Sequence, residues 1–171
     1  LKRWDALLRE RDAVGIFGAD THGRIGLTRK RFVRFPAYES LFSVARNYVL
    51  VRDEPSGDFG RDAQAVLDAV RSGRLYVGLD ALASSREVSF VVTSPGAERQ
   101  YTMGERAPWT EGLQARVAGR MPKGTEVILL RDGLPMTRGI GGLVTSLSAP
   151  GVYRVEARVP GWNVPWIVTN T

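Results

Sequence analysis

The apolar residues in the first half of the chain recur with a helical period or gather in short strand-like runs. Trp4, Leu7 and Leu8 share one face of a helix near the start of the chain. Three apolar, partly β-branched runs predict strands: Val14–Ala19, Tyr48–Val51 and Leu75–Leu79. We expect the first of these strands to be buried.

Two further helices are expected between these strands. Pro36 can open the first, because proline is favoured at the first helical position, and Tyr38, Leu41, Phe42 and Ala45 then share one face. Ser56 or Asp58 can cap the second, and Gly73 stands where a glycine commonly follows a helix. Strands that alternate with helices favour a layered or barrel-type α/β arrangement.

After about residue 84 the helical period disappears and short strand patterns follow one another. They are Val88–Thr93, Leu113–Val117, Thr125–Leu130, Leu143–Leu147, Val152–Val159 and Trp166–Thr169. Asp132-Gly133 offers a tight hairpin turn, since both residues tolerate positive φ. The fold class is therefore expected to be α+β. Residues 1–83 would form a partial β/α segment, and residues 84–171 an immunoglobulin-like β-sandwich.

Composition fits a globular protein, with 43% apolar and 25% charged among 171 residues. No apolar run approaches the roughly 20 residues of a membrane-spanning helix. The chain starts at Leu1 directly in a helical pattern, which reads as a trimmed piece. The net charge of +6 lies mostly in residues 1–34, which hold nine Lys/Arg and four Asp/Glu. This permits an anionic partner. The run Arg29-Lys30-Arg31 can contact nucleic acid, but such a run is more often a solvated edge. We therefore do not expect a nucleic-acid partner.

The candidate for chemistry is the step Asp20-Thr21-His22, which leaves the end of the first predicted strand. In an extended chain residues i and i+2 point the same way, so Asp20 and His22 can reach one Zn, Mn or Fe ion. The alternative is a turn-capping Asp20 and a hydrogen-bonded loop His22. The chain has one His and no Cys, so a complete catalytic site is not expected here. Arg24 can clamp a phosphate, or be a solvated loop arginine.

The segment Ile16-Phe17-Gly18-Ala19-Asp20-Thr21-His22-Gly23 resembles the last metal motif of the PHP (polymerase and histidinol phosphatase) superfamily, which usually reads Gly-Ser-Asp-Ala-His. The similarity continues through Phe35–Phe42 and Ala69–Val77, and into the strands that follow. It implies a distorted (β/α)7 barrel that binds two or three metal ions and hydrolyses phosphoesters or related bonds. Asp20 and His22 match its final ligand pair.

The resemblance also implies partners that this chain does not hold. The family's early His-x-His motif and middle Glu and His ligands have no counterpart, and would come from the upstream remainder of the polypeptide. We therefore expect this chain alone to be inactive towards a phosphorylated or other small-molecule substrate and to hold no metal tightly. A barrel fragment would leave apolar surface uncovered, so a homo-oligomer is also expected.

A second hypothesis places function in the sandwich, as a non-catalytic module that binds a ligand or a carbohydrate. Four aromatic residues suggest a sugar-stacking face: Trp109, Tyr153, Trp162 and Trp166. Packing in the core or between domains is the alternative, and it is the commoner use of such residues.

Overall fold

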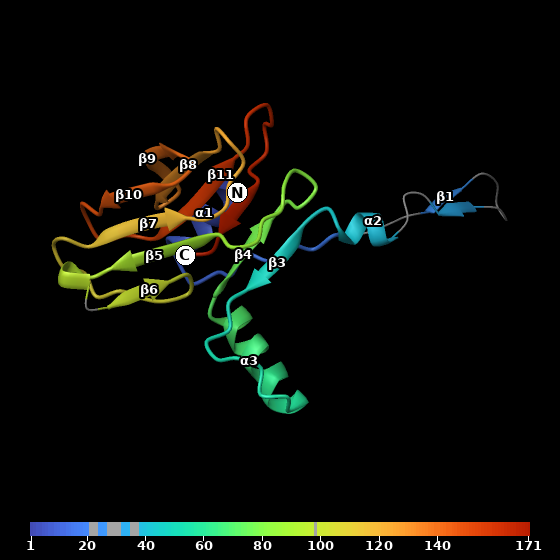
Figure 1. Ribbon diagram of the computed structural model, residues 1–171, viewed down its shortest axis with the longest axis horizontal. Coiled ribbons are helices and arrows are strands. Elements are labelled where there is room, and N and C mark those ends of the chain that lie inside the picture. Colours follow the sequence, from blue (N-terminus) through green and yellow to red (C-terminus); the bar gives the residue numbers. More distant parts are fainter. Residues whose placement is uncertain (21–23, 27–31, 35–37, 98) are drawn as a thin grey trace.

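The computed structural model describes residues 1–20, 24–26, 32–34, 38–97 and 99–171. Those residues are mostly β, with few helices, and two antiparallel sheets pack as a sandwich (Figure 1). The larger sheet has the order β3-β4-β12-β11-β8-β9. Its strands are β3 (Arg46–Val49), β4 (Leu75–Gly78), β8 (Glu126–Arg131), β9 (Leu134–Ile140), β11 (Tyr153–Arg158) and β12 (Ile167–Thr169).

The smaller sheet has the order β10-β7-β5-β6. Its strands are β5 (Ser89–Thr93), β6 (Gln100–Thr102), β7 (Gln114–Ala118) and β10 (Leu143–Ser146), with a 3-10 turn η1 (Pro95–Ala97) between the first two. The hairpin between β8 and β9 turns at Asp132 (φ 52°) and Gly133 (φ 79°), as the Asp-Gly pair predicts.

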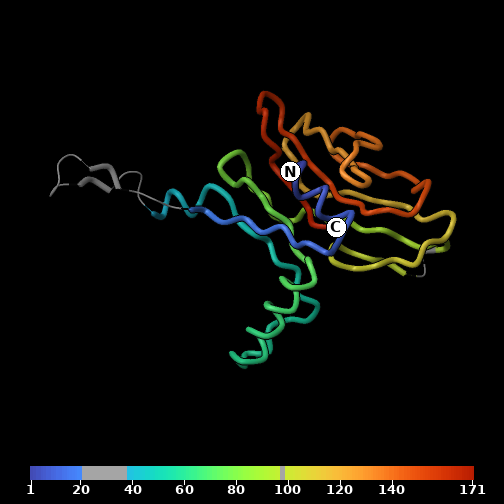
Figure 2. The backbone as a smooth tube through the Cα atoms, turned by 180° about the vertical axis from the view of Figure 1, so that it is seen from behind, coloured from blue at the N-terminus to red at the C-terminus, as the bar shows by residue number. Residues whose placement is uncertain are grey.

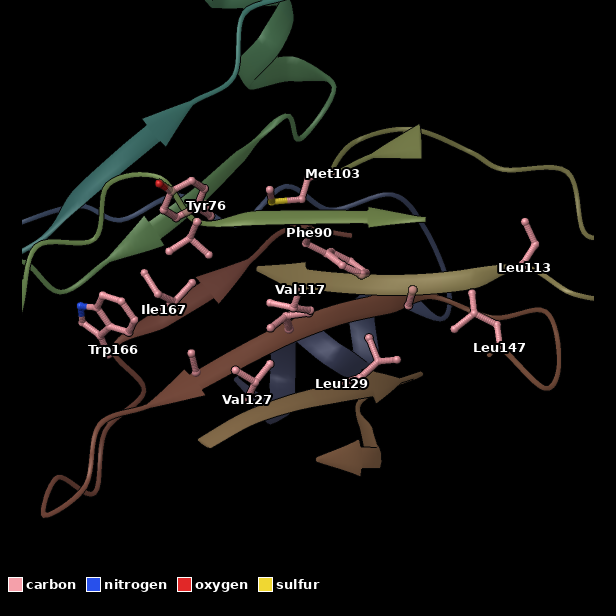
Figure 3. Packing of buried hydrophobic residues seen from close by; sticks show 14 residues of the cluster. Tyr76, Phe90, Met103, Leu113, Val117, Val127, Leu129, Leu147, Trp166 and Ile167 are labelled. Atoms are coloured by element: carbon pink, nitrogen blue, oxygen red, sulfur yellow. The ribbon is translucent and has the colours of Figure 1, made fainter. Parts of the chain in front are cut away.

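The core lies between the two sheets. Alternate residues of each strand point to the same face, so Val127, Leu129 and Val155 of the larger sheet meet Phe90 and Val117 of the smaller one. Figure 3 shows the side chains of Val127 and Leu129 directed towards those of Phe90 and Val117. Trp166 is fully buried at one end of the core, where its indole N–H donates to the carbonyl of Ala83 at 2.9 Å. The core thus joins strands from both halves of the chain.

A third layer covers the outer face of the larger sheet. Helix α1 (Lys2–Leu8) lies against β11, and the chain then runs in extended form across the sheet towards β3 (Figure 2). The contact is fixed by ion pairs between Asp5 and Arg154, whose side chains are both almost fully buried. The N-terminal segment is therefore an integral part of the sandwich.

Two parts of the chain project from this body (Figure 1). One is an arm with helix α2 (Tyr38–Phe42) and the antiparallel strands β1 (Arg24–Gly26) and β2 (Phe32–Arg34). The other is helix α3 (Phe59–Arg71), which joins β3 to β4. Among the described residues, no helix has the length and apolar character needed to cross a membrane.

The strand patterns after residue 84 are confirmed to within about two residues at each end, and so are β3 and β4. The helices expected around Trp4–Leu8 and after Asp58 are present as α1 and α3. Asp58 caps α3, since its carboxylate accepts from the Arg61 N–H at 2.8 Å, and Gly73 follows the helix with φ 77°. The expected boundary after residue 83 follows β4, but the larger sheet combines β3 and β4 with four strands from residues 84–171.

Candidate functional site

The segment that leads to Asp20 is held by two asparagine side chains. Asn170, next to β12, accepts from the Gly15 N–H at 2.7 Å and donates to the Gly15 carbonyl at 2.9 Å. Asn47 of β3 accepts from the Phe17 N–H at 2.8 Å and donates to the Phe17 carbonyl at 2.9 Å. A side-chain amide presents an N–H donor beside a carbonyl acceptor, as a peptide group does. Each asparagine thus replaces one residue of a neighbouring strand.

The prediction of a buried strand over Val14–Ala19 is wrong in two respects. The segment is extended but is not assigned as a strand, because side-chain amides satisfy Gly15 and Phe17 in place of a strand ladder. Val14 and Ile16 are exposed, whereas the residues that alternate with them are half-buried. Apolar character alone misled the prediction, because one side of the segment faces away from the sandwich.

The three predicted site residues are Asp20, His22 and Arg24. Of these, the structure describes both the main chain and the side chain of Asp20. Asp20 ends the extended segment, with an exposed side chain and φ 39°, in the left-handed region that aspartate tolerates better than most residues. His22 lies outside the described residues. Arg24 begins β1, and its main chain pairs with Arg34 of β2. The chain therefore leaves the sandwich at Asp20 and enters the arm.

The described residues do not by themselves make a metal site. No group of three or more His, Cys, Asp or Glu side chains among them is arranged to hold an ion. Asp20 is one oxygen-donor residue, and a catalytic zinc usually has three protein ligands. The donor set of the described part of the chain therefore does not fit a metal on its own, and we derive no chemical step through one.

A buried ionic network fixes α1 to the sandwich, ahead of the asparagine-held segment. The Arg154 guanidinium donates to both carboxylate oxygens of Asp5, at 2.6 Å and 2.9 Å, and to Glu156 at 2.8 Å. Arg158 completes the network with a 2.8 Å bond to Glu156. Burial lowers the pKa of Arg154, but hydrogen bonds to Asp5 and Glu156 outweigh burial and leave this pKa raised. Arg154 therefore stays charged, which it must be to compensate two buried carboxylates.

The β8–β9 turn closes over this network at Gly133. A Cβ built on Gly133 would lie 2.6 Å from the Cβ of Asp5, and its φ of 79° also disfavours other residues. Glycine at this position therefore serves both the turn and the close approach of α1.

A second polar cluster lies beside β3 and β4, around Asp80. Its carboxylate accepts from the Tyr48 hydroxyl at 2.8 Å, from Arg46 at 2.8 Å and from the Ser85 N–H at 3.1 Å. Burial raises the pKa of Asp80, but these hydrogen bonds and the Arg46 charge outweigh burial and lower it. The carboxylate uses its hydrogen bonds to connect the loop after β4 to the edge strand β3, so we assign Asp80 a structural role.

The aromatic residues proposed as a sugar-stacking face do not form one face. Trp166 belongs to the core, as the packing alternative predicts. Trp162 and Trp109 are 56% and 42% exposed, respectively, and lie in different loops. Trp109 and Tyr153 do line the same cleft, at one end of the sandwich.

Sequence reasoning missed the residues that hold the segment: Asp5, Asn47, Arg154 and Asn170. One signal was present for Arg154 and Glu156. They alternate in β11 with Tyr153, Val155 and Ala157, so both charges had to face a partner on the sheet's outer side. No comparable signal marks Asn47 or Asn170. Comparison of the chain with protein-family models, curated proteins and solved structures gives no match.

Proposed function

We propose that this chain is the C-terminal part of a PHP-type metal-dependent hydrolase that acts on phosphoesters. In this proposal Asp20 and His22 are two of the metal ligands, and polypeptide outside this chain supplies the others. The single observation that carries the proposal is the geometry ahead of Asp20. Residues 13–19 leave the sandwich in an extended conformation and are fastened at Gly15 and Phe17.

This geometry suits a barrel strand that delivers ligands from its C-terminal end. In barrel enzymes the residues that do chemistry stand at the C-terminal ends of the strands. Asp20 occupies that position in the extended segment, and the positive φ at Asp20 turns the chain there. The sandwich, which we propose to be immunoglobulin-like, would then act as an accessory domain. The two asparagines would hold the extended segment in a fixed position on that domain.

Uncovered apolar side chains on the projecting parts support a missing neighbour. Helix α3 exposes 88% of Phe59, with Val66 and Leu67 on the same side and about half exposed. Ile16 of the extended segment and Phe42 of α2 in the arm are also largely exposed. A single short helix with a bare apolar stripe is marginal in water, and such stripes normally pack against another element. The remainder of a barrel would supply that cover.

The proposed substrate class follows from charge as well as from resemblance. Residues 1–34 are strongly basic, and Arg24 comes four positions after Asp20. A guanidinium offers paired donors that match the oxygens of a phosphate. In the proposed enzyme Arg24 therefore binds and orients the phosphoryl group of the substrate.

The test compares this chain with the same polypeptide extended at its N-terminus by its natural upstream residues. Metal content is measured by mass spectrometry, and activity with p-nitrophenyl phosphate. We expect bound metal and hydrolysis only in the extended form, and loss of both in Asp20→Asn and His22→Asn. Asp53→Asn, which removes an exposed acid from a loop, is the matched control and should change neither. An extended polypeptide that holds no metal and cleaves no phosphoester would refute the proposal.

A further inference from the structure

One end of the sandwich contains an open cleft of about 970 Å³. We define this end cleft by two of its walls, residues 8–14 of the N-terminal segment and residues 101–107 with Trp109 at and after β6. A volume of this size is at the upper end of what small-molecule sites have. The end cleft contains neither Asp20 nor the arm, so it is separate from the proposed metal-ligand segment.

The inner surface of the end cleft is apolar and its sides are aromatic. Phe90 and Leu147 of the core line it, so its floor reaches the space between the two sheets. The aromatic residues that line it are Tyr101, Trp109 and Tyr153. The guanidinium of Arg99 lies over the Tyr101 ring, 4.9 Å from the ring centre. Flat aromatic walls over an apolar floor favour a flat, apolar ligand.

Most acids at the mouth of the end cleft are already paired. Asp12 accepts from Arg106 at 2.7 Å, which joins the two walls. Glu105 accepts from the Thr102 N–H at 3.0 Å and from Arg52 at 2.8 Å, and both contacts lower its pKa. Its carboxylate therefore stays ionised and occupied.

Three charged groups of the end cleft remain outside these pairs. They are Arg9, Glu10 and Arg11, none of which takes part in an ion pair among the described residues. Two of the three are positive. The unpaired charge around the end cleft is thus positive.

We propose that the end cleft binds a flat aromatic small molecule that carries one anionic group. The ring lies over the apolar floor beside Trp109 and Tyr101, and the anion meets Arg9 and Arg11 at the mouth. The Asp12–Arg106 ion pair spans the opening of the end cleft. Breaking this pair to admit the ligand costs little free energy, because both side chains are more than 80% exposed and such pairs are weak. This site needs neither a metal nor upstream polypeptide.

The test uses 2-naphthoate as the probe and two-dimensional amide NMR of this chain as the readout. We expect saturable shifts in residues 8–14 and 101–109. The neutral analogue 2-naphthylmethanol should bind at the same place but more weakly. Arg9→Gln/Arg11→Gln should weaken the affinity for 2-naphthoate by roughly five- to tenfold, as expected for the loss of two partly exposed ion pairs. The affinity for the alcohol should stay unchanged.

The matched control is Arg86→Gln/Arg120→Gln, which removes two positive charges from exposed residues that do not line the end cleft. It should leave both probes unaffected. Trp109→Ala should weaken both, because both stack on the indole. Shifts that map to α3 instead, shifts that do not saturate, or an equal loss of both probes in Arg9→Gln/Arg11→Gln would overturn the proposal. None of these results bears on metal binding, so the two proposals stand or fall separately.

Discussion

Asn170 holds the main chain of Gly15 with both atoms of its side-chain amide, although 155 positions separate the two residues. The same amide group also donates to the Leu75 carbonyl at 3.2 Å. One side chain, 3% exposed, thus joins the N-terminal segment, β4 and the end of β12. This side chain therefore fixes the segment that carries Asp20 at Gly15, as Asn47 does at Phe17.

Asn170→Ala should therefore lower the free energy of unfolding by about 1–3 kcal/mol, because it removes both side-chain partners of the half-buried Gly15 main chain. The Leu75 carbonyl keeps its bond from the main-chain N–H of residue 170. Asn47→Ala removes an equivalent pair of bonds at an exposed position, where water can replace them, and should cost less than about 1 kcal/mol. Urea unfolding of both variants measures the difference. Amide exchange at Gly15 should also accelerate in Asn170→Ala. An equal cost for the two substitutions would show that the burial of Asn170 is unimportant.

The buried ionic network predicts a larger effect. Arg154→Met leaves the carboxylates of Asp5 and Glu156 in a buried site without their shared cation, which should cost about 3–5 kcal/mol. Arg138→Met, which breaks the exposed pair with Glu126, should cost at most about 1 kcal/mol. Thermal or urea unfolding tests both. A loss in Arg154→Met as small as that in Arg138→Met would mean that α1 does not depend on the network.

The strands that could be predicted are those whose apolar residues alternate over a buried face. Leu113, Ala115 and Val117 gave the position and the inward face of β7, and the structure buries all three. β9 was missed because it is an edge strand with a proline, Pro135, and with mostly exposed or half-buried side chains, so no such alternation marks it. β6 was missed because three residues carry too little pattern.

The contacts that position the candidate site could not be predicted, because they are polar and distant in sequence. Asn170 is 155 residues from Gly15, and Arg154 is 149 residues from Asp5. No periodicity links such residues. Asp20, by contrast, was found from residue type and from its place after an apolar run, and the structure puts it where the chain leaves the sandwich. Its role as a metal ligand stays a prediction.

The stability of the sandwich should fall at high pH because of Tyr76. Burial raises the pKa of this phenol to about 12, and its hydroxyl donates to the Ser85 carbonyl at 2.8 Å. The unfolded chain releases this proton near pH 10, so between pH 10 and about 12 the folded state holds more protons than the unfolded state. Stability from this group is complete below pH 10 and is lost as the pH rises towards 12, by up to about 2–3 kcal/mol.

Tyr76→Phe isolates this effect. The variant should lose about 0.5–1.5 kcal/mol at pH 7 with the hydrogen bond to Ser85. Its further loss between pH 10 and 12 should be smaller than that of the unchanged protein, since the titrating group is gone. Urea unfolding across this pH range measures both slopes. Parallel slopes would assign the alkaline instability to other groups.

The apolar stripe of α3 predicts self-association of this chain. Phe59, Val66 and Leu67 lie exposed on one side of a helix that projects from the sandwich, and surfaces of this kind drive association when nothing covers them. We expect sedimentation equilibrium to show a mass that rises with concentration. Val66→Gln/Leu67→Gln should shift the protein towards monomer and change the free energy of unfolding by no more than about 0.5 kcal/mol, because both side chains are about half exposed. Ala65→Gln, on an exposed position of the same helix outside the stripe, is the control and should associate as before. If the unchanged chain stays monomeric at millimolar concentration, the stripe does not bind another copy.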